Sequence, residues 1–322
     1  MAMTGPVTEV MRVGGSHIPD LLERVEQRLA EVAASHGALL AKHAGSTIAA
    51  GGKRLRPLLV FLAADGEEGE GLVRAATAVE LIHSATLVHD DVLDAAALRR
   101  GVPTVVATAG RAAATATGDL LFARAFAELA GNGRADEVRV LSEASSALAE
   151  GELLQRADAW NPAVSLERYL RRCELKTARL FEAACRLGAL EAGGAPGGLG
   201  AFGRRIGLAF QLLDDVLDVS GPSARTGKQR GTDLLDGTVT LPFILARARD
   251  GGLAALDPRS IDSPAVAEDV CDRIAATGAL DEARARALEI VNEAKAGLPA
   301  GLSARQRHAL ELVATGVVAR YA

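Results

Sequence analysis

Apolar residues recur at helical spacing along almost the whole chain, and this pattern predicts an all-α protein. The clearest early stripe lies within residues 18–42 and consists of Leu21, Leu22, Val25, Leu29 and Val32. Longer helical patterns cover residues 72–97, 104–130, 137–157, 165–190, 201–219, 239–250, 264–276, 279–296 and 303–320. No segment shows sustained two-residue alternation, so the sequence predicts no β-strand.

Two connectors interrupt the helices, a glycine-rich one at residues 191–200 and a polar one at residues 221–233. Either could mark a domain boundary. The strongest motifs lie on both sides of them, however, so we interpret residues 16–322 as one helical domain. The first fifteen residues, 1–15, carry no anchoring pattern and are expected to be disordered.

Composition supports a helical core and argues against nucleic-acid binding. The 322 residues are 49% hydrophobic but only 3% aromatic, so the core must consist mainly of Leu, Ala and Val. Ala and Leu favour helices, whereas sheets favour β-branched and aromatic residues. The formal net charge of -5 gives no electrostatic support for a nucleic-acid partner.

The cysteines and the apolar runs indicate the cellular setting. The chain has three cysteines, Cys173, Cys185 and Cys271, with no Cys-x-x-Cys pair, so neither a disulfide framework nor a zinc site is expected. No signal-peptide pattern appears, and no apolar run reaches the roughly 18 residues that cross a bilayer. We therefore expect a cytoplasmic protein without a transmembrane segment.

An Asp-Asp-x-x-Asp motif occurs at residues 90–94 and again at residues 214–218, each time inside an apolar helical pattern. Because positions i and i+4 share one helix face, the first and last aspartates of each copy project side by side. Such carboxylates repel each other unless a cation binds them, and oxygen ligands of this kind suit Mg²⁺. One copy alone could be a solvated helix face, but two copies with basic motifs nearby favour a magnesium site.

The order of motifs along the chain resembles that of trans-isoprenyl diphosphate synthases, the polyprenyl synthetase family. The resemblance extends over about residues 20–320. It rests on the ordered set Gly51-Gly52-Lys53-Arg54-Leu55-Arg56-Pro57, His83 to Asp94, Arg99-Arg100-Gly101, Gly118-Asp119, Glu150-Gly151-Glu152, Lys176-Thr177 and Phe210-Gln211-x-x-Asp214-Asp215. It implies a helical bundle of the isoprenoid-synthase type around a central cavity, and a homodimer.

The implied activity is a magnesium-dependent, head-to-tail condensation of isopentenyl diphosphate with an allylic diphosphate to give a medium- or long-chain all-trans polyprenyl diphosphate. In the implied mechanism the allylic C–O bond ionises and the C3–C4 alkene of isopentenyl diphosphate attacks the cation. C2 then loses a proton to the departing pyrophosphate. No side-chain nucleophile is needed, and release of the apolar product would allow a transient contact with a membrane.

The resemblance also implies roles for single residues. About three Mg²⁺ ions would be held by carboxylates, namely Asp90, Asp91, Asp94 and Asp214, with Asp215 and Asp218 nearby. Isopentenyl diphosphate would be bound by Lys53, Arg56, His83 and Arg100. The allylic diphosphate would be bound by Arg99, Lys176, Thr177, Gln211 and Lys228. Catalysis would depend on Asp90, Asp94, Asp214, Lys176 and Arg99.

The lysines support these assignments independently. Only five of the 36 basic residues are lysines, and Lys53, Lys176 and Lys228 fall on motif positions. A lysine in an arginine-rich chain indicates a need for a compact ammonium group. One position departs from the family's usual Gly-Lys-x-Thr-Leu-Pro, since Thr238 replaces the lysine and puts one phosphate contact in doubt. His89 has no implied role.

Product length should depend on the residues just before the first acidic motif. The resemblance implies that a growing chain extends between helices there and that bulky side chains stop it. Ala85 and Thr86 are both small, which favours a medium or long product. Deeper positions that could close such a tunnel, or simply form the core, are Leu81, Ile82, Leu120, Leu121 and Phe122.

Three other functions are compatible with parts of this pattern. A terpene cyclase would also use an acidic helix and Mg²⁺, but it needs no second motif and its pocket is usually rich in aromatic residues. A non-catalytic subunit of a heteromeric synthase would tend to lose motif residues, and both motifs are intact. A short-chain farnesyl or geranylgeranyl diphosphate synthase would differ only in the depth of its tunnel.

Overall fold

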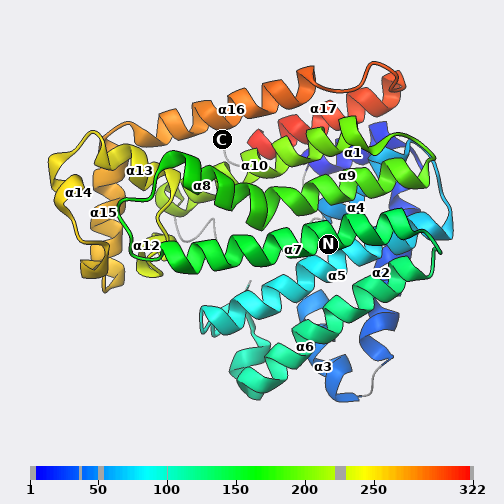
Figure 1. Ribbon diagram of the computed structural model, residues 1–322, viewed down its shortest axis with the longest axis horizontal. Coiled ribbons are helices and arrows are strands. Elements are labelled where there is room, and N and C mark those ends of the chain that lie inside the picture. Colours follow the sequence, from blue (N-terminus) through cyan, green and yellow to red (C-terminus); the bar gives the residue numbers. More distant parts are fainter. Residues whose placement is uncertain (1–4, 36–37, 50–53, 100, 222–229, 320–322) are drawn as a thin grey trace. The chain divides into compact units, whose positions relative to one another are not determined.

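The computed structural model consists almost entirely of helices (Figure 1), and it describes residues 5–35, 38–49, 54–99, 101–221 and 230–319. The prediction of an all-α fold is confirmed. The chain divides into two compact units. The first comprises Met1–Ser145, Leu180–Gly203 and Gly297–Val313, and the second comprises Ser146–Arg179, Arg204–Ala296 and Ala314–Ala322. That residues 16–322 act as one functional domain stays a prediction.

Each unit has helices of its own, and three long helices run through both. The first unit contains α1 (Gly5–Gly14), α2 (Ile18–Ala34), α3 (Ala38–Ala49), α4 (Leu55–Ala64), α5 (Glu70–Leu93), α6 (Val105–Ala130) and nearly all of α9 (Arg179–Glu191). The second contains α8 (Leu166–Cys173), the π-helix η1 (Glu174–Ala178), α12 (Thr232–Leu235), α13 (Leu241–Arg247), α14 (Gly251–Ala255), the 3₁₀-helix η2 (Pro258–Ser260), α15 (Pro264–Ala276) and α16 (Ala279–Ala296). Both units share α7 (Ala135–Asp158), α10 (Pro196–Ser220) and α17 (Ala304–Ala319).

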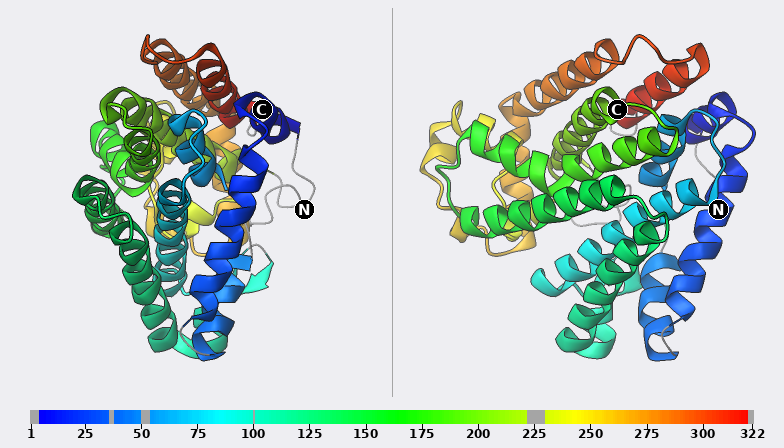
Figure 2. Two further views of the ribbon diagram at one scale, coloured as in Figure 1. Left: turned by 90° about the vertical axis from the view of Figure 1, so that its right-hand side faces the viewer. Right: turned by 45° about the vertical axis from the view of Figure 1, so that its right-hand side comes forward.

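Helix α5 is the core helix of the first unit and carries the first acidic motif at its end. Its buried residues lie on every side and include Leu72, Val79, Leu81, Ile82 and Val88. A helix that is apolar all round belongs in a protein core. It packs lengthwise against α6 and also contacts α2 and α4 (Figures 1 and 2). Among the described helices it is the one long and apolar enough to cross a membrane, but 72% of its apolar window is buried inside the protein.

The first predicted helix is present but shorter than expected. Four members of the predicted apolar stripe, Leu21, Val25, Leu29 and Val32, are buried in α2, whereas Leu22 is half-buried. The helix ends at Ala34 and α3 begins at Ala38, so the pattern over residues 18–42 belongs to two helices.

Residues 5–14 form helix α1, which differs from the expectation of a disordered N-terminus. Val10 is 3% exposed, and a Cβ added to Gly14 would lie 2.6 Å from Cδ2 of Leu62 in α4. A helix of this length is unstable in isolation, so burial against the rest of the first unit must stabilise it. The apolar stripe is too short to reveal this packing.

Two irregular features follow α5, a small hairpin before α6 and a kink within α6. β1 (Leu98–Arg99) pairs antiparallel with β2 (Val102–Pro103), and Gly101 adopts a positive φ of 78° in the turn. These strands have two residues each, too few for an alternating pattern to predict them. Gly110 also has a positive φ, of 83°, and kinks α6 where the sequence predicted one continuous helix.

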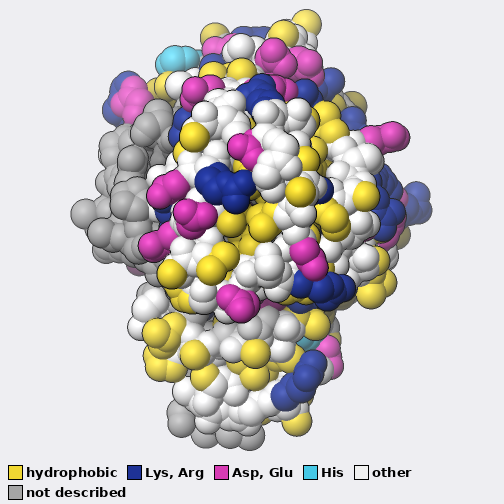
Figure 3. Space-filling model, turned by 90° about the vertical axis from the view of Figure 1, so that its left-hand side faces the viewer, with side chains coloured by type: hydrophobic (Ala, Val, Ile, Leu, Met, Phe, Trp, Pro, Cys, Tyr) yellow, Lys and Arg dark blue, Asp and Glu magenta, His cyan; other side chains and the backbone are white. Residues whose placement is uncertain are grey.

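Charged side chains of both signs lie among hydrophobic ones on the face shown in Figure 3. No large area of a single sign is visible there. This face therefore lacks the basic footprint of a nucleic-acid-binding protein.

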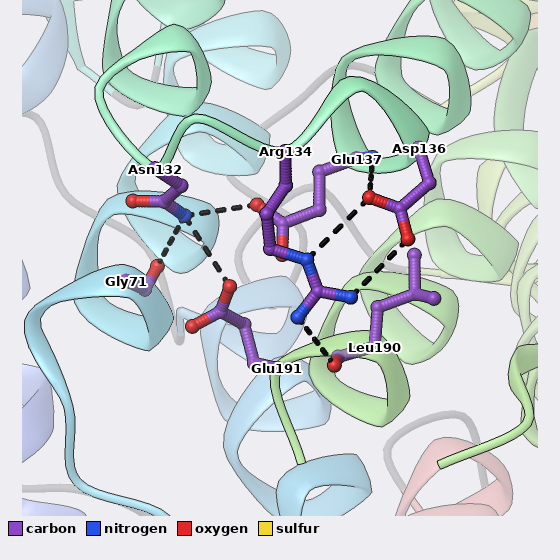
Figure 4. A network of polar contacts seen from close by, with 7 residues as sticks. All are labelled: Gly71, Asn132, Arg134, Asp136, Glu137, Leu190 and Glu191. Atoms are coloured by element: carbon purple, nitrogen blue, oxygen red, sulfur yellow. Dashed lines mark hydrogen bonds and ion pairs between the residues drawn. The ribbon is translucent and has the colours of Figure 1, made fainter. Parts of the chain in front are cut away.

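A polar network joins the start of α5 to α7 and α9 (Figure 4). Asn132 Nδ2 donates hydrogen bonds to the Gly71 carbonyl oxygen at 3.0 Å and to Glu137 Oε2 at 2.9 Å. Glu137 is fully buried. Burial, together with a hydrogen bond to Glu191, raises the pKa of Glu137 to about 8, although Arg134 lies nearby. Between pH 4.5 and about 8, Glu137 therefore keeps its proton in the folded protein and loses it in the unfolded chain.

We expect Glu137→Gln to alter the pH dependence of folding. The pKa of Glu137 is about 8 when folded and 4.5 for a free side chain, so the wild type should be most stable relative to the variant below pH 4.5. That advantage should be lost as the pH rises towards 8. One pKa unit corresponds to about 1.4 kcal/mol, so the full shift from 4.5 to about 8 would give about 5 kcal/mol. Screening by solvent should reduce the measured advantage to about 2–3 kcal/mol.

Urea unfolding across this pH range would measure the difference. Glu143→Gln, which changes an exposed glutamate on the same helix, should keep the wild-type pH dependence. A constant difference in unfolding free energy between wild type and Glu137→Gln would contradict the assignment.

Candidate active site

The first acidic motif lies at the C-terminal end of α5. Asp90 and Asp94 are one helical turn apart, and the Asp94 N–H donates to the Asp90 carbonyl oxygen at 2.8 Å. Asp94 is exposed and Asp90 is half-buried. The C-terminal end of a helix carries the negative end of its dipole, so two carboxylates here create a field that favours a bound cation.

Asp91, the middle residue of this motif, points away from its two neighbours. It is buried, and its Oδ1 accepts a hydrogen bond from Arg99 Nε at 2.7 Å. Arg99 lies in β1, so the small hairpin delivers this guanidinium group to the end of α5. Asp91 therefore holds Arg99, and its role as a metal ligand stays a prediction.

His89 has a structural role that the sequence analysis could not assign. Its ring stacks on Phe122 with centroids 5.7 Å apart, and its Nε2 lies 3.3 Å from Asp119 Oδ1. A Cβ added to Gly118 would overlap the His89 ring. The Gly118-Asp119 pair of the motif series thus provides the surface of α6 on which His89 sits.

The other described candidates of the first unit lie on α4 and α5. The Arg56 guanidinium carbon lies 4.7 Å from the centre of the Phe181 ring, a cation–π contact that orients its side chain. His83 is half-buried, and its carbonyl oxygen accepts a hydrogen bond from Thr86 Oγ1 at 2.8 Å. Ala85 is fully buried. The predicted ligands outside the described residues are Lys53, Arg100 and Lys228.

The second acidic motif lies within the last two turns of α10, in the second unit. Asp214 and Asp218 are half-buried and one turn apart. Asp218 Oδ2 accepts a hydrogen bond from the Asp233 N–H at 3.3 Å. Both motifs thus place a pair of carboxylates near the negative end of a helix dipole.

Asp215, the middle residue of this motif, is buried in a chain of hydrogen bonds. Thr177 Oγ1 donates to Gln211 Oε1 at 2.6 Å, and Gln211 Nε2 donates to Asp215 Oδ1 at 2.7 Å. The hydroxyl of Tyr169, also buried, donates to Asp215 Oδ2 at 2.7 Å. Burial and the nearby charge of Asp233 raise the pKa of Asp215 to about 7, against the effect of these hydrogen bonds. Two residues predicted to bind the allylic substrate, Thr177 and Gln211, are thereby fixed to the acidic motif.

Lys176 and Thr177 lie in the π-helical turn η1 between α8 and α9. Turns of this kind occur mostly inside α-helices and frequently at functional sites. Lys176 Nζ donates to the Glu152 carboxylate. Burial opposes ionisation of Glu152, but the charge and hydrogen bond of Lys176 outweigh it, and the pKa of Glu152 is lowered. A Cβ added to Gly151 would lie 2.5 Å from the backbone nitrogen of Lys176, so this glycine lets α7 approach η1 closely.

The backbone around Thr238, which stands where the family usually has lysine, is fixed on both sides. The Trp160 N–H donates to the Gly237 carbonyl oxygen at 2.8 Å. The buried Arg172 donates through Nη2 to the Val239 carbonyl oxygen at 2.6 Å. The backbone on either side of Thr238 is therefore held by α8 and by the turn that precedes it.

The donor chemistry of the two motifs fits Mg²⁺. Asp90 with Asp94, and Asp214 with Asp218, offer hard oxygen ligands. Within the described part of the chain, no three or more His, Cys, Asp or Glu side chains are arranged as a complete metal site. Mg²⁺ usually takes one or two carboxylates and completes its shell with water and substrate phosphates.

The chain is similar to known proteins of one family. The polyprenyl synthetase family model matches residues 38–257. The chain is 39% identical to the octaprenyl diphosphate synthase of Escherichia coli (strain K12) over 260 residues, which cover 78% of this chain and 80% of that protein. It is 41% identical to the heptaprenyl diphosphate synthase component 2 of Geobacillus stearothermophilus over 254 residues, covering 76% of this chain and 79% of that protein.

A solved structure is similar over the full length. It is the polyprenyl synthase from Caulobacter crescentus CB15 complexed with calcium and isoprenyl diphosphate. The TM-score is 0.89 at 36% identity, and the match covers 100% of each chain.

We expect Gly151→Ala to destabilise the protein. Replacing a helical glycine by alanine usually stabilises by about 0.5–1 kcal/mol, but here the added methyl group would collide with the η1 backbone. Overpacking of this kind should lower the free energy of unfolding by about 1–3 kcal/mol, measured by urea denaturation. Gly197→Ala in α10, where an added Cβ meets nothing within 4 Å, should be neutral or slightly stabilising. Equal stability of the two variants would contradict the close packing of α7 on η1.

Proposed function

The chain belongs to the polyprenyl synthetase family, and from this we propose that it condenses isopentenyl diphosphate with an allylic diphosphate to give a medium- or long-chain all-trans polyprenyl diphosphate. The observation that carries the proposal is the pair of carboxylates at the C-terminal end of each of two helices. Relatives named octaprenyl and heptaprenyl diphosphate synthases support a long product.

The chain's own charged groups prepare the departure of the diphosphate. Bound Mg²⁺ supplies positive charge that stabilises this leaving group. Asp90, Asp94 and Asp214 would hold about three such ions. Lys176, presented by η1, and Arg99, held by Asp91, provide fixed cations where negative charge develops.

The bond changes require no covalent intermediate with the protein. The allylic C–O bond breaks, and a new C–C bond forms between allylic C1 and C4 of isopentenyl diphosphate. A proton leaves C2 with the released pyrophosphate as its acceptor. Thr177 and Gln211 orient the allylic diphosphate, with Lys228 as a further cation.

The homoallylic substrate would bind to residues of the first unit. Arg56, oriented by its contact with Phe181, and His83 would bind the diphosphate of isopentenyl diphosphate together with Lys53 and Arg100. The small side chains of Ala85 and Thr86 would leave room for the growing tail along α5.

Assembly and location are further parts of the proposal. We propose a cytoplasmic homodimer that releases its apolar product during a transient contact with a membrane. A second candidate is a subunit of a heteromeric synthase, because one relative is named component 2 of a heptaprenyl diphosphate synthase. Activity of the purified chain alone would distinguish the two.

We expect Asp90→Asn to lower kcat by about a hundredfold or more, because a carboxylate that binds cations against the leaving group is lost. The variant should also need more Mg²⁺ for half-maximal activity. Incorporation of labelled isopentenyl diphosphate at several Mg²⁺ concentrations would measure both effects. Asp281→Asn, at a side chain that is 86% exposed, should behave as wild type. Near-normal turnover of Asp90→Asn would overturn the proposed function.

We expect Ala85→Phe to shorten the product. The ring would occupy space beside α5 that the tail is proposed to enter, while Ala85→Ser should leave product length unchanged. Mass spectrometry of the products made from farnesyl or geranylgeranyl diphosphate would measure chain length. An unchanged product from Ala85→Phe would refute the tunnel beside Ala85.

A further inference from the structure

Arg54 is the one basic residue of the Lys53-Arg54-Leu55-Arg56 run that the proposed function leaves without a role. It is the N-cap residue of α4 and adopts a left-handed conformation, with φ of 47° and ψ of 39°. This conformation costs free energy for any residue with a Cβ. Such a residue persists only where its surroundings fix it.

The Arg54 guanidinium group is fixed by three other helices. Its Nε and Nη2 donate to the two carboxylate oxygens of Glu26 in α2, at 2.5 and 3.0 Å. Its Nη1 donates to Glu80 Oε1 in α5 at 2.6 Å, and Nη2 also donates to the Ile48 carbonyl oxygen in α3 at 3.0 Å. Four of its five N–H groups are thus engaged within the first unit.

Burial and charge make this contact set strong. The Arg54 side chain is 10% exposed and that of Glu80 is 5% exposed. Burial opposes the charge of Arg54, but hydrogen bonds and attraction from Glu26 and Glu80 outweigh it, so the pKa of Arg54 is raised. A guanidinium group neutralised by two carboxylates is a poor ligand for a diphosphate.

The backbone of Arg54 sets the start of α4. Its carbonyl oxygen accepts the hydrogen bond of the Leu58 N–H at 3.0 Å, so its left-handed conformation fixes the direction of the first turn. Arg56 lies in that turn. We infer that Arg54 is a positioning residue for the homoallylic diphosphate: it anchors α4 to α2, α3 and α5 so that Arg56 is presented correctly. This inference rests on the proposed function.

The test compares two substitutions at Arg54. Arg54→Gln and Arg54→Lys should both raise the KM for isopentenyl diphosphate about tenfold or more. Neither side chain reproduces the several fixed N–H donors of the guanidinium group. The KM for the allylic diphosphate and kcat should change less than about twofold. If Arg54 bound the phosphate itself, Arg54→Lys would keep its charge and retain most of the affinity, which would overturn the inference.

A substitution of Glu26, which binds the Arg54 guanidinium group, separates the two roles because they predict opposite changes in the KM for isopentenyl diphosphate. Glu26→Gln should raise the KM for isopentenyl diphosphate, because it weakens the anchor of Arg54. If Arg54 were a ligand, removing this competing carboxylate would lower that KM instead. Glu26 is 48% exposed, so this variant should fold even if those at Arg54 do not.

Arg24→Gln is the matched control. Arg24 also extends from α2, where it donates to the Glu68 carbonyl oxygen at 2.9 Å and pairs with Glu70, but it does not touch α4 in the described contacts. It should leave both KM values unchanged. A wild-type protein that incorporates no isopentenyl diphosphate would refute the proposed function. An active wild type with an unchanged KM in Arg54→Gln would refute only the positioning role.

Discussion

Repulsion between carboxylates at the ends of two apolar helices is the constraint on which the rest of the site depends. Asp90 and Asp94 lie one turn apart at the negative end of the α5 dipole, and Asp214 and Asp218 lie likewise near the end of α10. Neither arrangement favours folding in the absence of cations. Under the proposed function, an incoming diphosphate with its Mg²⁺ ions would remove this cost. The same electrostatic repulsion that opposes folding would then contribute to the affinity for the metal-bound substrate.

The two acidic motifs are identical in sequence but not in environment. Successive residues of a helix point in directions about 100° apart, so the middle aspartate of each motif turns towards the protein. Asp91 meets a guanidinium group, that of Arg99. Asp215 meets two neutral donors, from Tyr169 and Gln211. The first pairing fixes a cation beside its motif, and the second connects its motif to Thr177, so the two copies differ in the groups held next to them.

The sequence predicts the helical class, the main helices and both carboxylate pairs, because apolar periodicity and i,i+4 spacing are local properties. It does not predict the short helix α1, the two-residue hairpin or the kink at Gly110, because burial and backbone dihedrals of single residues determine these. It also missed Tyr169, whose partner lies 46 residues further along the chain. Apolar spacing predicts a continuous helix through the π-helical turn that carries Lys176, because an i→i+5 turn has no signature in that spacing. Gly151 appeared only as a motif residue, although it allows that turn to pack against α7.

The preference for arginine in this chain has a physical explanation in the described residues. Arg54 uses its fork to join three helices, Arg99 extends from the hairpin to a buried carboxylate, and Arg172 donates to a buried carbonyl group. Arg54 uses several donors with fixed geometry, which lysine cannot provide, and Arg99 and Arg172 each direct one N–H of a planar group at a buried oxygen. Lys176 instead presents a compact charge on a flexible stem, from a turn that Gly151 and Glu152 hold in place. Arginine therefore forms buried contacts in both units, and under the proposed function lysine would bring charge to the substrate together with Arg56 and Arg99.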